Sequence, residues 1–175
     1  MSTAVIDTFR ARMSRVPTSV VIAATLHDER PVGMLVGTFA SVSLEPSLVG
    51  FLGDLSSTTV PLLLAADRIC FSVLAQTAYP AVTQAFRRPS RERFEGLGWT
   101  ASPSGLPRVG PAVLYVEGSV YGTGAAGDHM IIRVQPDLIE CGEAESPLVF
   151  WGGRMMGIGA TELPSPIWQL GQVRP

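Results

Sequence analysis

The chain has 175 residues, of which 46 % are hydrophobic and 16 % charged, and its net charge at pH 7 is −2. This charge argues against a nucleic-acid partner, and the lack of any run of about 18 uninterrupted apolar residues argues against a membrane-spanning helix. The length is that of one ordinary domain, so we expect a single domain over residues 1–175, located in the cytoplasm because the chain opens without a signal-like segment.

The apolar excess is high for a chain with so few charges. We expect it to be divided between a core and a subunit interface, which indicates a homodimer. The two cysteines, Cys70 and Cys141, lie far apart, and neither has a second cysteine or a histidine at ligand spacing. We therefore expect neither a disulfide nor a metal site.

Apolar periodicity predicts the elements in chain order. Residues 5–13 repeat apolar side chains at helical spacing, and short helices are also predicted over 59–66 and 78–86. Residues 87–107, which include four arginines and three prolines, are predicted to be a loop. The predicted strands cover residues 18–25, 32–43, 48–52, 69–74, 112–121, 129–134 and 148–151.

About eight short strands, few helices and many Gly and Pro turns indicate a mainly β fold, a closed or nearly closed antiparallel barrel with a few peripheral helices. Residues 122–127 match the dinucleotide-binding pattern G-x-G-x-x-G. That pattern needs a helix that begins on its glycines, but the residues that follow here are β-rich as far as Pro136. We therefore interpret 122–127 as a glycine turn between two antiparallel strands.

Two segments could bind a nucleotide. In residues 55–59 (LSSTT), between a buried strand and a short helix, a phosphate could accept hydrogen bonds from Ser57, Thr58 or Thr59; an ordinary helix N-cap is the alternative. Residues 33–46 place small and hydroxyl side chains along a β-rich segment. A planar ring could lie against them, and a plain barrel strand is the alternative.

Two further groups could contribute chemistry. His129 follows Gly127 and Asp128 at a predicted turn-to-strand junction, where it could form hydrogen bonds or handle a proton; the alternative is a satisfied surface histidine. Residues 87–94 are rich in arginine with few acidic neighbours. They could contact an anion or form a solvated loop.

Taken in order, these segments resemble the flavin reductase-like family, the small reductase components of two-component flavin monooxygenases. The motifs are RVPTSV at 15–20, FASVSLEP at 39–46, STT at 57–59, AADRICFSVL at 65–74, RF at 93–94, GDH at 127–129 and PLVF at 147–150. Ser19 stands where the family usually has glycine, and Ser72 where it usually has asparagine. The strand after His129 is expected to be shorter than usual.

The resemblance implies an FMN-binding split β-barrel that acts as an NAD(P)H-dependent flavin reductase, an oxidoreductase that passes reduced FMN or FAD to a partner monooxygenase. It implies a homodimer and requires no metal. The implied residues are Val36, Gly37, Thr38 and Ser41 along the flavin ring, Ser57, Thr58, Thr59 and Arg93 at the flavin phosphate, and Asp128 and His129 near the nicotinamide, with His129 orienting hydride transfer.

The residues leave several choices open. They separate neither NADH from NADPH nor FMN from FAD. The serines at positions 19 and 72 are also compatible with a non-catalytic flavin-binding or electron-carrier protein on the same fold. A pyridoxamine-phosphate-oxidase-like or haem-handling split-barrel protein is a further alternative.

Overall fold

The structure is a computed structural model that describes residues 3–144 and 146–158. Its elements are α1 (Thr3–Met13), β1 (Thr18–Ser19), β2 (Val21–His27), β3 (Arg30–Val36), β4 (Ala40–Leu44), β5 (Ser47–Asp54), α2 (Val60–Ala65), β6 (Arg68–Leu74), η1 (Gln76–Ala78), α3 (Tyr79–Ala85), η2 (Ser90–Glu95), β7 (Trp99–Ala101), β8 (Pro107–Val109), β9 (Ala112–Ala126), β10 (His129–Cys141), β11 (Leu148–Trp151) and β12 (Arg154–Gly157). The fold is mainly β, as the sequence predicts. None of the described helices is long and apolar enough to cross a membrane.

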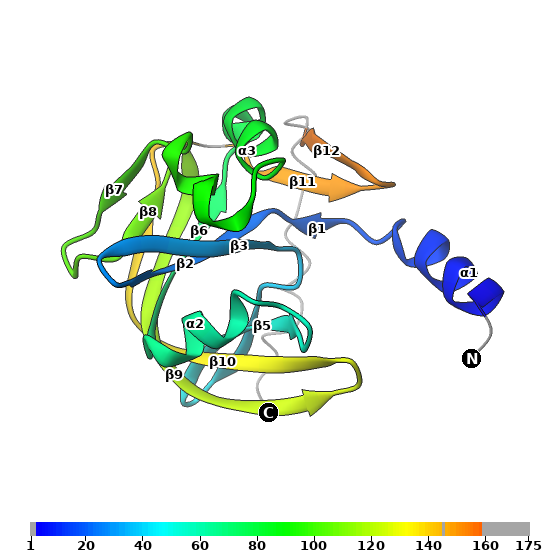
Figure 1. Cartoon of the computed structure of the whole chain (residues 1–175), viewed down its shortest axis with the longest axis horizontal. Coiled ribbons are helices and arrows are strands. Elements are labelled where there is room, and N and C mark those ends of the chain that lie inside the picture. Colours follow the sequence, from blue (N-terminus) through cyan, green and yellow to red (C-terminus); the bar gives the residue numbers. More distant parts are fainter. Residues whose placement is uncertain (1–2, 145, 159–175) are drawn as a thin grey trace, which may run out of the picture.

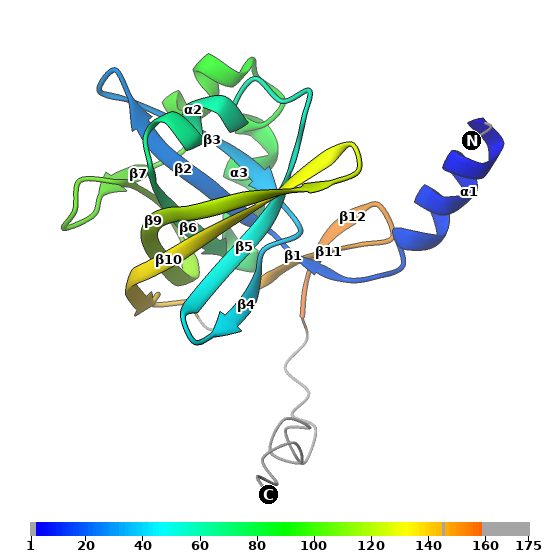
Figure 2. The same ribbon diagram turned by 90° about the horizontal axis from the view of Figure 1, so that it is seen from below.

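Seven strands form one antiparallel sheet in the order β3-β2-β6-β9-β10-β5-β4 (Figure 1). Strands β3 and β4 are its edges (Figure 2). The sheet curls, and β3 contacts β5. A hydrogen bond from Leu52 N on β5 to Thr38 Oγ1, 2.9 Å long, links the chain beyond β3 to β5. A three-stranded sheet, β1-β11-β12, and the β7–β8 hairpin flank it. This arrangement agrees with the predicted split barrel.

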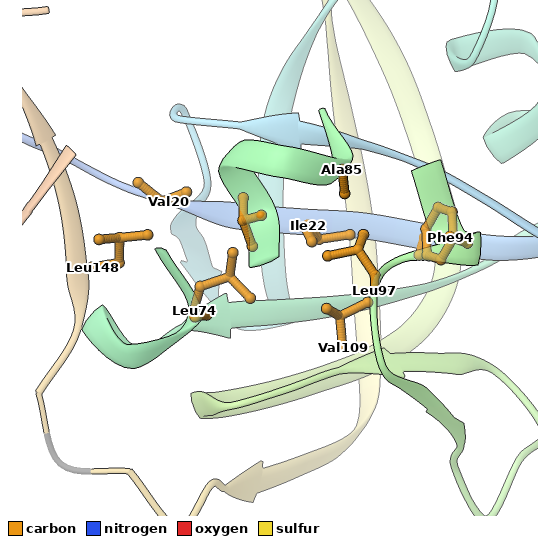
Figure 3. Close-up of a cluster of buried hydrophobic side chains, with 11 residues drawn as sticks. Val20, Ile22, Leu74, Ala85, Phe94, Leu97, Val109 and Leu148 are labelled. Carbon is orange, nitrogen blue, oxygen red and sulfur yellow. The ribbon is translucent and has the colours of Figure 1, made fainter. Parts of the chain in front are cut away.

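The hydrophobic core packs against both faces of the segment made of Val20 and β2. Val20, Ile22 and Ala24 point into a cluster beneath α3 and η2, where Figure 3 shows Val20 and Ile22 among side chains from β6, β8 and β11. Val21 and Ala23 point into a second cluster with the inner face of the curled sheet and α2. Because both faces are covered, this strand is a continuous apolar run and does not alternate apolar with polar residues.

A buried ionic network fixes the β7–β8 hairpin on the sheet. Glu117 on β9 is fully buried and accepts hydrogen bonds from Ser102 Oγ (2.9 Å), Ser104 Oγ and Arg108 Nε (2.8 Å). Arg108 also forms an ion pair with Glu140 on β10. A buried carboxylate needs such donors because its charge has left water. The loop predicted over 87–107 therefore contains η2 and β7 and reaches β8.

The predicted glycine turn over 122–127 is wrong, because β9 continues through this segment and pairs with β10. The hairpin loop is Gly127 and Asp128, and Gly127 has φ of +71°, a conformation that favours glycine. A Cβ on Gly124 would lie 3.3 Å from Ile131 Cγ2, so the neighbouring strand occupies the space above that glycine. The rejection of the dinucleotide motif is confirmed, since a strand follows these glycines.

Strand β10 is longer than the predicted strand over 129–134, because pairing with β9 continues past Pro136. The register shifts directly after Pro136, and a bulge is where a strand tolerates a residue without an N–H. Gly118 lies opposite, and a Cβ there would come within 2.1 Å of Gln135 O. The expectation that this strand is shorter than is usual in the family stays a prediction.

The strand predicted over 32–43 is two strands, β3 and β4, separated by residues 37–39. Strand β3, before this break, pairs with β2, and β4, after it, pairs with β5. One β-rich segment therefore supplies both edge strands of the curled sheet. With the short strands β1, β7, β8 and β12, the described residues form twelve strands and not about eight.

Candidate functional site

A polar hollow of about 450 Å³ opens beside the loop that joins β5 to α2. It is lined by Ser57, Thr58 and Thr59, the residues predicted to bind a phosphate. Ser57 Oγ accepts hydrogen bonds from Thr59 N (3.2 Å) and Val60 N (3.3 Å), so it satisfies amides at the start of α2. Thr59 is the N-cap residue of α2 and forms no side-chain capping hydrogen bond, so the ordinary N-cap alternative is not what the structure shows. The O–H of Ser57 can still donate to a ligand.

Arg93 on η2 lines the same hollow. Its guanidinium carbon lies 5.0 Å from the centre of the Phe86 ring. Its Nε is buried and has no hydrogen-bond partner among the described residues. A buried N–H without an acceptor is costly, and an anion in the hollow would supply that acceptor. Arg93 and the three hydroxyl residues therefore form a candidate phosphate site.

A second, largely apolar hollow of about 420 Å³ lies where the end of β3 meets β1, the end of α1 and the β11–β12 hairpin. Val36, Gly37 and Thr38 line it, although most of the Val36 side chain is buried in the core. A Cβ on Gly37 would lie 3.0 Å from Thr18 Oγ1, so the two segments approach closely. Leu35 lines both hollows, which places them next to each other.

The Gly-Asp-His segment lies at the tip of the β9–β10 hairpin, where His129 pairs with Asp54 across the ladder. Leu55 N donates to Asp128 O (3.1 Å), which joins this tip to the loop after β5. His129 Nδ1 lies 2.7 Å from Asp128 Oδ1, and this hydrogen bond lowers the pKa of Asp128. Hydrogen bonds from Ser56 lower the pKa of Asp54. Asp128 therefore orients the imidazole beside the hydroxyl-bearing loop.

The structure gathers most of the predicted site residues into one region, spread over these three places. The polar hollow contains Ser57, Thr58, Thr59 and Arg93, the apolar hollow Val36, Gly37 and Thr38, and the hairpin tip Asp128 and His129. Ser41 is exposed on β4 and lines neither hollow.

The sequence analysis named Ser72 without a structural role, and it did not single out Leu35 and Ser90. Ser72 is fully buried, and its Oγ accepts a hydrogen bond from Val109 N (3.0 Å), so it supports β8 and lines neither hollow. Leu35 and Ser90 line the polar hollow but were not predicted. In the sequence, nothing distinguishes Leu35 from the other hydrophobic residues of a strand. Ser90 lies in an arginine-rich segment, where no signal singles it out.

A curled antiparallel sheet with a polar hollow beside an apolar one places the chain in the class of split-barrel proteins. Residues 13–159 match the sequence profile of the family described as "Flavin reductase like domain". The chain belongs to this family.

Similar proteins cover nearly the whole chain. A flavin reductase of Pseudomonas putida is 33 % identical over 153 residues, which span 87 % of this chain and 89 % of that protein. The reductase subunit HsaB of a flavin-dependent monooxygenase of Mycobacterium tuberculosis is 28 % identical over 93 % of this chain and 87 % of its own. A nitrilotriacetate monooxygenase component B homologue of Mycobacterium thermoresistibile superposes with a TM-score of 0.86 at 26 % identity and covers 94 % of both chains.

Proposed function

We propose that this chain is an NAD(P)H-dependent flavin reductase that supplies reduced FMN or FAD to a partner monooxygenase. The observation that carries the proposal is the buried, unpartnered Nε of Arg93 in a hollow that also contains three hydroxyl residues. This donor set suits a flavin phosphate, and the apolar hollow across Leu35 suits the attached ring. The monooxygenase partner is supported by the names of the relatives HsaB and nitrilotriacetate monooxygenase component B.

The chain's own residues would hold the flavin in place. A bound flavin supplies the hydride-accepting chemistry. Arg93 would neutralise the phosphate charge, and the O–H of Ser57 would donate to the phosphate. Gly37, which lines the apolar hollow and has no side chain, would contact the ring edge through its main chain. The hydrogen bond between Leu52 N and Thr38 Oγ1 holds this segment still, which preserves the alignment that hydride transfer needs.

His129 would orient the nicotinamide against the flavin. Its hydrogen bond to Asp128 fixes the ring, and the ladder pair with Asp54 places it next to the phosphate loop. An imidazole held in one orientation reduces the freedom that a bound dinucleotide must lose before reaction. This role needs no proton transfer to or from His129.

We also propose that two copies of the chain associate through α1. This helix stands apart from the sheets in both views (Figure 1, Figure 2). Its apolar residues Val5, Ile6, Phe9 and Met13 are all exposed, and Phe9 is 61 % exposed. A contiguous apolar helix face of this kind usually marks an interaction surface. A second copy that covers it would account for the apolar excess of the chain.

The reductase proposal is tested by mixing the purified protein with NADH or NADPH and with FMN or FAD, in all four combinations. The loss of the reduced-nicotinamide absorbance band reports the reaction. A flavin-dependent loss well above the protein-free control supports the reductase and selects both cofactors. Four flat traces with retained flavin binding contradict it and assign a non-catalytic flavin-binding protein.

A further inference from the structure

The ring of Phe86, just after α3, lines the polar hollow together with Arg93. The Arg93 guanidinium carbon lies 5.0 Å from the ring centre, within the range of a cation–π attraction. Among residues 3–144 and 146–158, the side chain of Arg93 has no ion pair and no hydrogen bond. The Phe86 ring is therefore the described group that orients this guanidinium.

Two other arginines of the chain lie over tyrosine rings, and each of them also has a polar partner. Arg108 forms an ion pair with Glu117, and Arg133 donates a hydrogen bond to the carbonyl oxygen of Thr123 at 3.3 Å. In those two places the ring adds to a contact that already fixes the guanidinium. At Arg93 the ring acts without such a contact from the described residues.

An aromatic ring is a suitable support for an arginine that binds an anion. A carboxylate in the same place would occupy the N–H groups of Arg93 and neutralise its charge, so it would compete with a phosphate. A ring that lies against a guanidinium leaves the N–H groups at the edge of the guanidinium plane available. The buried Nε of Arg93, which lacks an acceptor in the described protein, fits this second arrangement.

Both members of the pair are anchored in the same core cluster. Phe86 N donates to Val82 O (3.0 Å) at the end of α3, and the Phe86 ring packs against the cluster that contains the buried Val82 and Ala85. Phe94, next to Arg93 in the chain, is buried in that cluster as well, and Figure 3 shows it on η2 with Ala85 on α3. The ring and the guanidinium therefore approach each other from two fixed backbone segments.

We propose that Phe86 is a positioning residue for the flavin phosphate, because its ring holds the Arg93 guanidinium in the orientation that meets the phosphate. Phe86 acts through Arg93 and needs no polar contact of its own. The inference rests on the proposed function, which places the flavin phosphate in the polar hollow. It predicts that the loss of the ring weakens the binding of flavins that have a phosphate and spares a flavin that has none.

The test compares FMN with riboflavin, which has the same ring and ribityl chain but no phosphate. Both are titrated into the wild type, Phe86→Leu and Phe86→Tyr, with flavin fluorescence as the readout. Phe86→Leu should bind FMN about fivefold more weakly than the wild type does, while its affinity for riboflavin should change less than about twofold. Phe86→Tyr, which restores an aromatic face, should keep both affinities within about twofold of the wild type.

Two controls separate this role from a general packing role. Tyr121→Leu removes the ring beside Arg133, outside both hollows, and should leave FMN affinity unchanged. In an Arg93→Ala background, Phe86→Leu should weaken FMN binding by less than about twofold, because the residue through which it acts is gone. Thermal melting verifies that each variant is folded. Phe86→Met, which keeps a long apolar side chain, carries the same expectation and replaces Phe86→Leu if that variant does not fold.

The proposal is overturned if the loss of the ring weakens FMN and riboflavin binding equally, if it leaves FMN affinity at the wild-type value, or if its effect persists without Arg93. The titrations need no turnover, so failure of the proposed function is a separate result. A wild type that favours FMN over riboflavin, responds to Phe86→Leu as expected and shows no turnover keeps the positioning role and loses the reductase. A wild type that binds both flavins equally well overturns the phosphate site and this role with it.

Discussion

At the scale of single residues, the candidate site depends on side chains whose hydrogen bonding inside the chain is incomplete. Arg93 Nε is buried and lacks an acceptor among the described residues. For His129, the described hydrogen bond is the one between Nδ1 and Asp128. Polar groups left in this state suit a bound ligand, because the ligand then completes the hydrogen bonds without displacing internal partners.

The role of His129 predicts a selective loss of turnover. Changing His129→Asn should lower kcat about tenfold or more, because the ring that orients the nicotinamide is lost. Flavin affinity measured by fluorescence titration should stay unchanged. The chain offers a matched control in His27→Asn, because His27 is also followed by an aspartate, 3.6 Å away, but lies on the β2–β3 hairpin. Equal kcat values for the two variants would rule out this role.

Cys70 predicts a dependence of stability on pH. Burial, above all, raises the pKa of its thiol from 9.0 to about 12. Between these values the unfolded chain loses the proton that the folded chain keeps, so the free energy of unfolding falls as pH rises from 9.0 to about 12. The effect reaches about 1.4 kcal/mol per pH unit and is absent below this window.

The measurement is urea unfolding at several pH values in the wild type and in Cys70→Ala, since subtraction cancels the other titrating groups. The wild type should lose stability more steeply with pH than the variant. Parallel slopes would show that Cys70 ionises normally. Alkylation of the folded protein compares the two free cysteines. Cys141 is exposed and should be modified, whereas Cys70 is buried and should stay unmodified.

At the scale of elements, the β7–β8 hairpin is attached to the sheet largely through Glu117. Hydrogen bonds from Ser102 and Ser104 and the ion pair with Arg108 all converge on this one carboxylate. The sequence shows only a glutamate in a β-rich run, so neither its burial nor the hairpin could be predicted. Both depend on contacts between Glu117 and residues that are more than eight positions away in the sequence.

Changing Glu117→Gln should lower the free energy of unfolding by about 3 kcal/mol. The reason is that Arg108, whose side chain is only 14 % exposed, loses its buried counter-charge. Urea unfolding measures the loss. The control Glu140→Gln removes the other, 43 % exposed carboxylate on Arg108 and should cost less than about 1 kcal/mol. Similar losses in both variants would contradict the account of the network.

Local sequence predicted the positions of most elements and failed where pairing overrides local preference. The run at β11 (Leu148–Trp151) was predicted with the observed bounds, because it is a short apolar strand between clear turn signals. In the sequence, the glycines of β9 indicated a turn, and Pro136 of β10 indicated the end of a strand. The ladder nevertheless accepts them, since Gly118 gives Gln135 the space that a side chain would occupy. A single sequence does not show such compensation across strands.

At the scale of the whole molecule, the exposed face of α1 is the feature that a single copy leaves unexplained. Changing Phe9→Asp should shift the protein from dimer to monomer and raise the dimer Kd about a hundredfold or more, because a charge replaces a central apolar contact. Light scattering over a dilution series measures this. The control Ala11→Asp puts the same charge on the opposite side of the same helix and should leave the dimer intact. A wild type that is monomeric throughout would refute the interface.

The overall class was predictable because the motifs keep their order along the chain. The mainly β fold and the family followed from them. The arrangement of the site did not follow, because the two hollows are separated by Leu35 and completed by the β11–β12 hairpin, far along the chain. The single domain over 1–175 stays a prediction, as its last residues lie outside the described range.

The measurement that tests the central claim most directly is the steady-state rate of nicotinamide oxidation against flavin concentration, in the wild type, Arg93→Ala and the control Arg88→Ala. If Arg93 holds the flavin phosphate of a working reductase, its removal should raise the KM for flavin about tenfold or more, with kcat changed less than about twofold. Arg88, exposed and outside the polar hollow, should leave both constants unchanged. Wild-type turnover with the same flavin KM in all three proteins would place the phosphate elsewhere, and no turnover in the wild type would contradict the reductase itself.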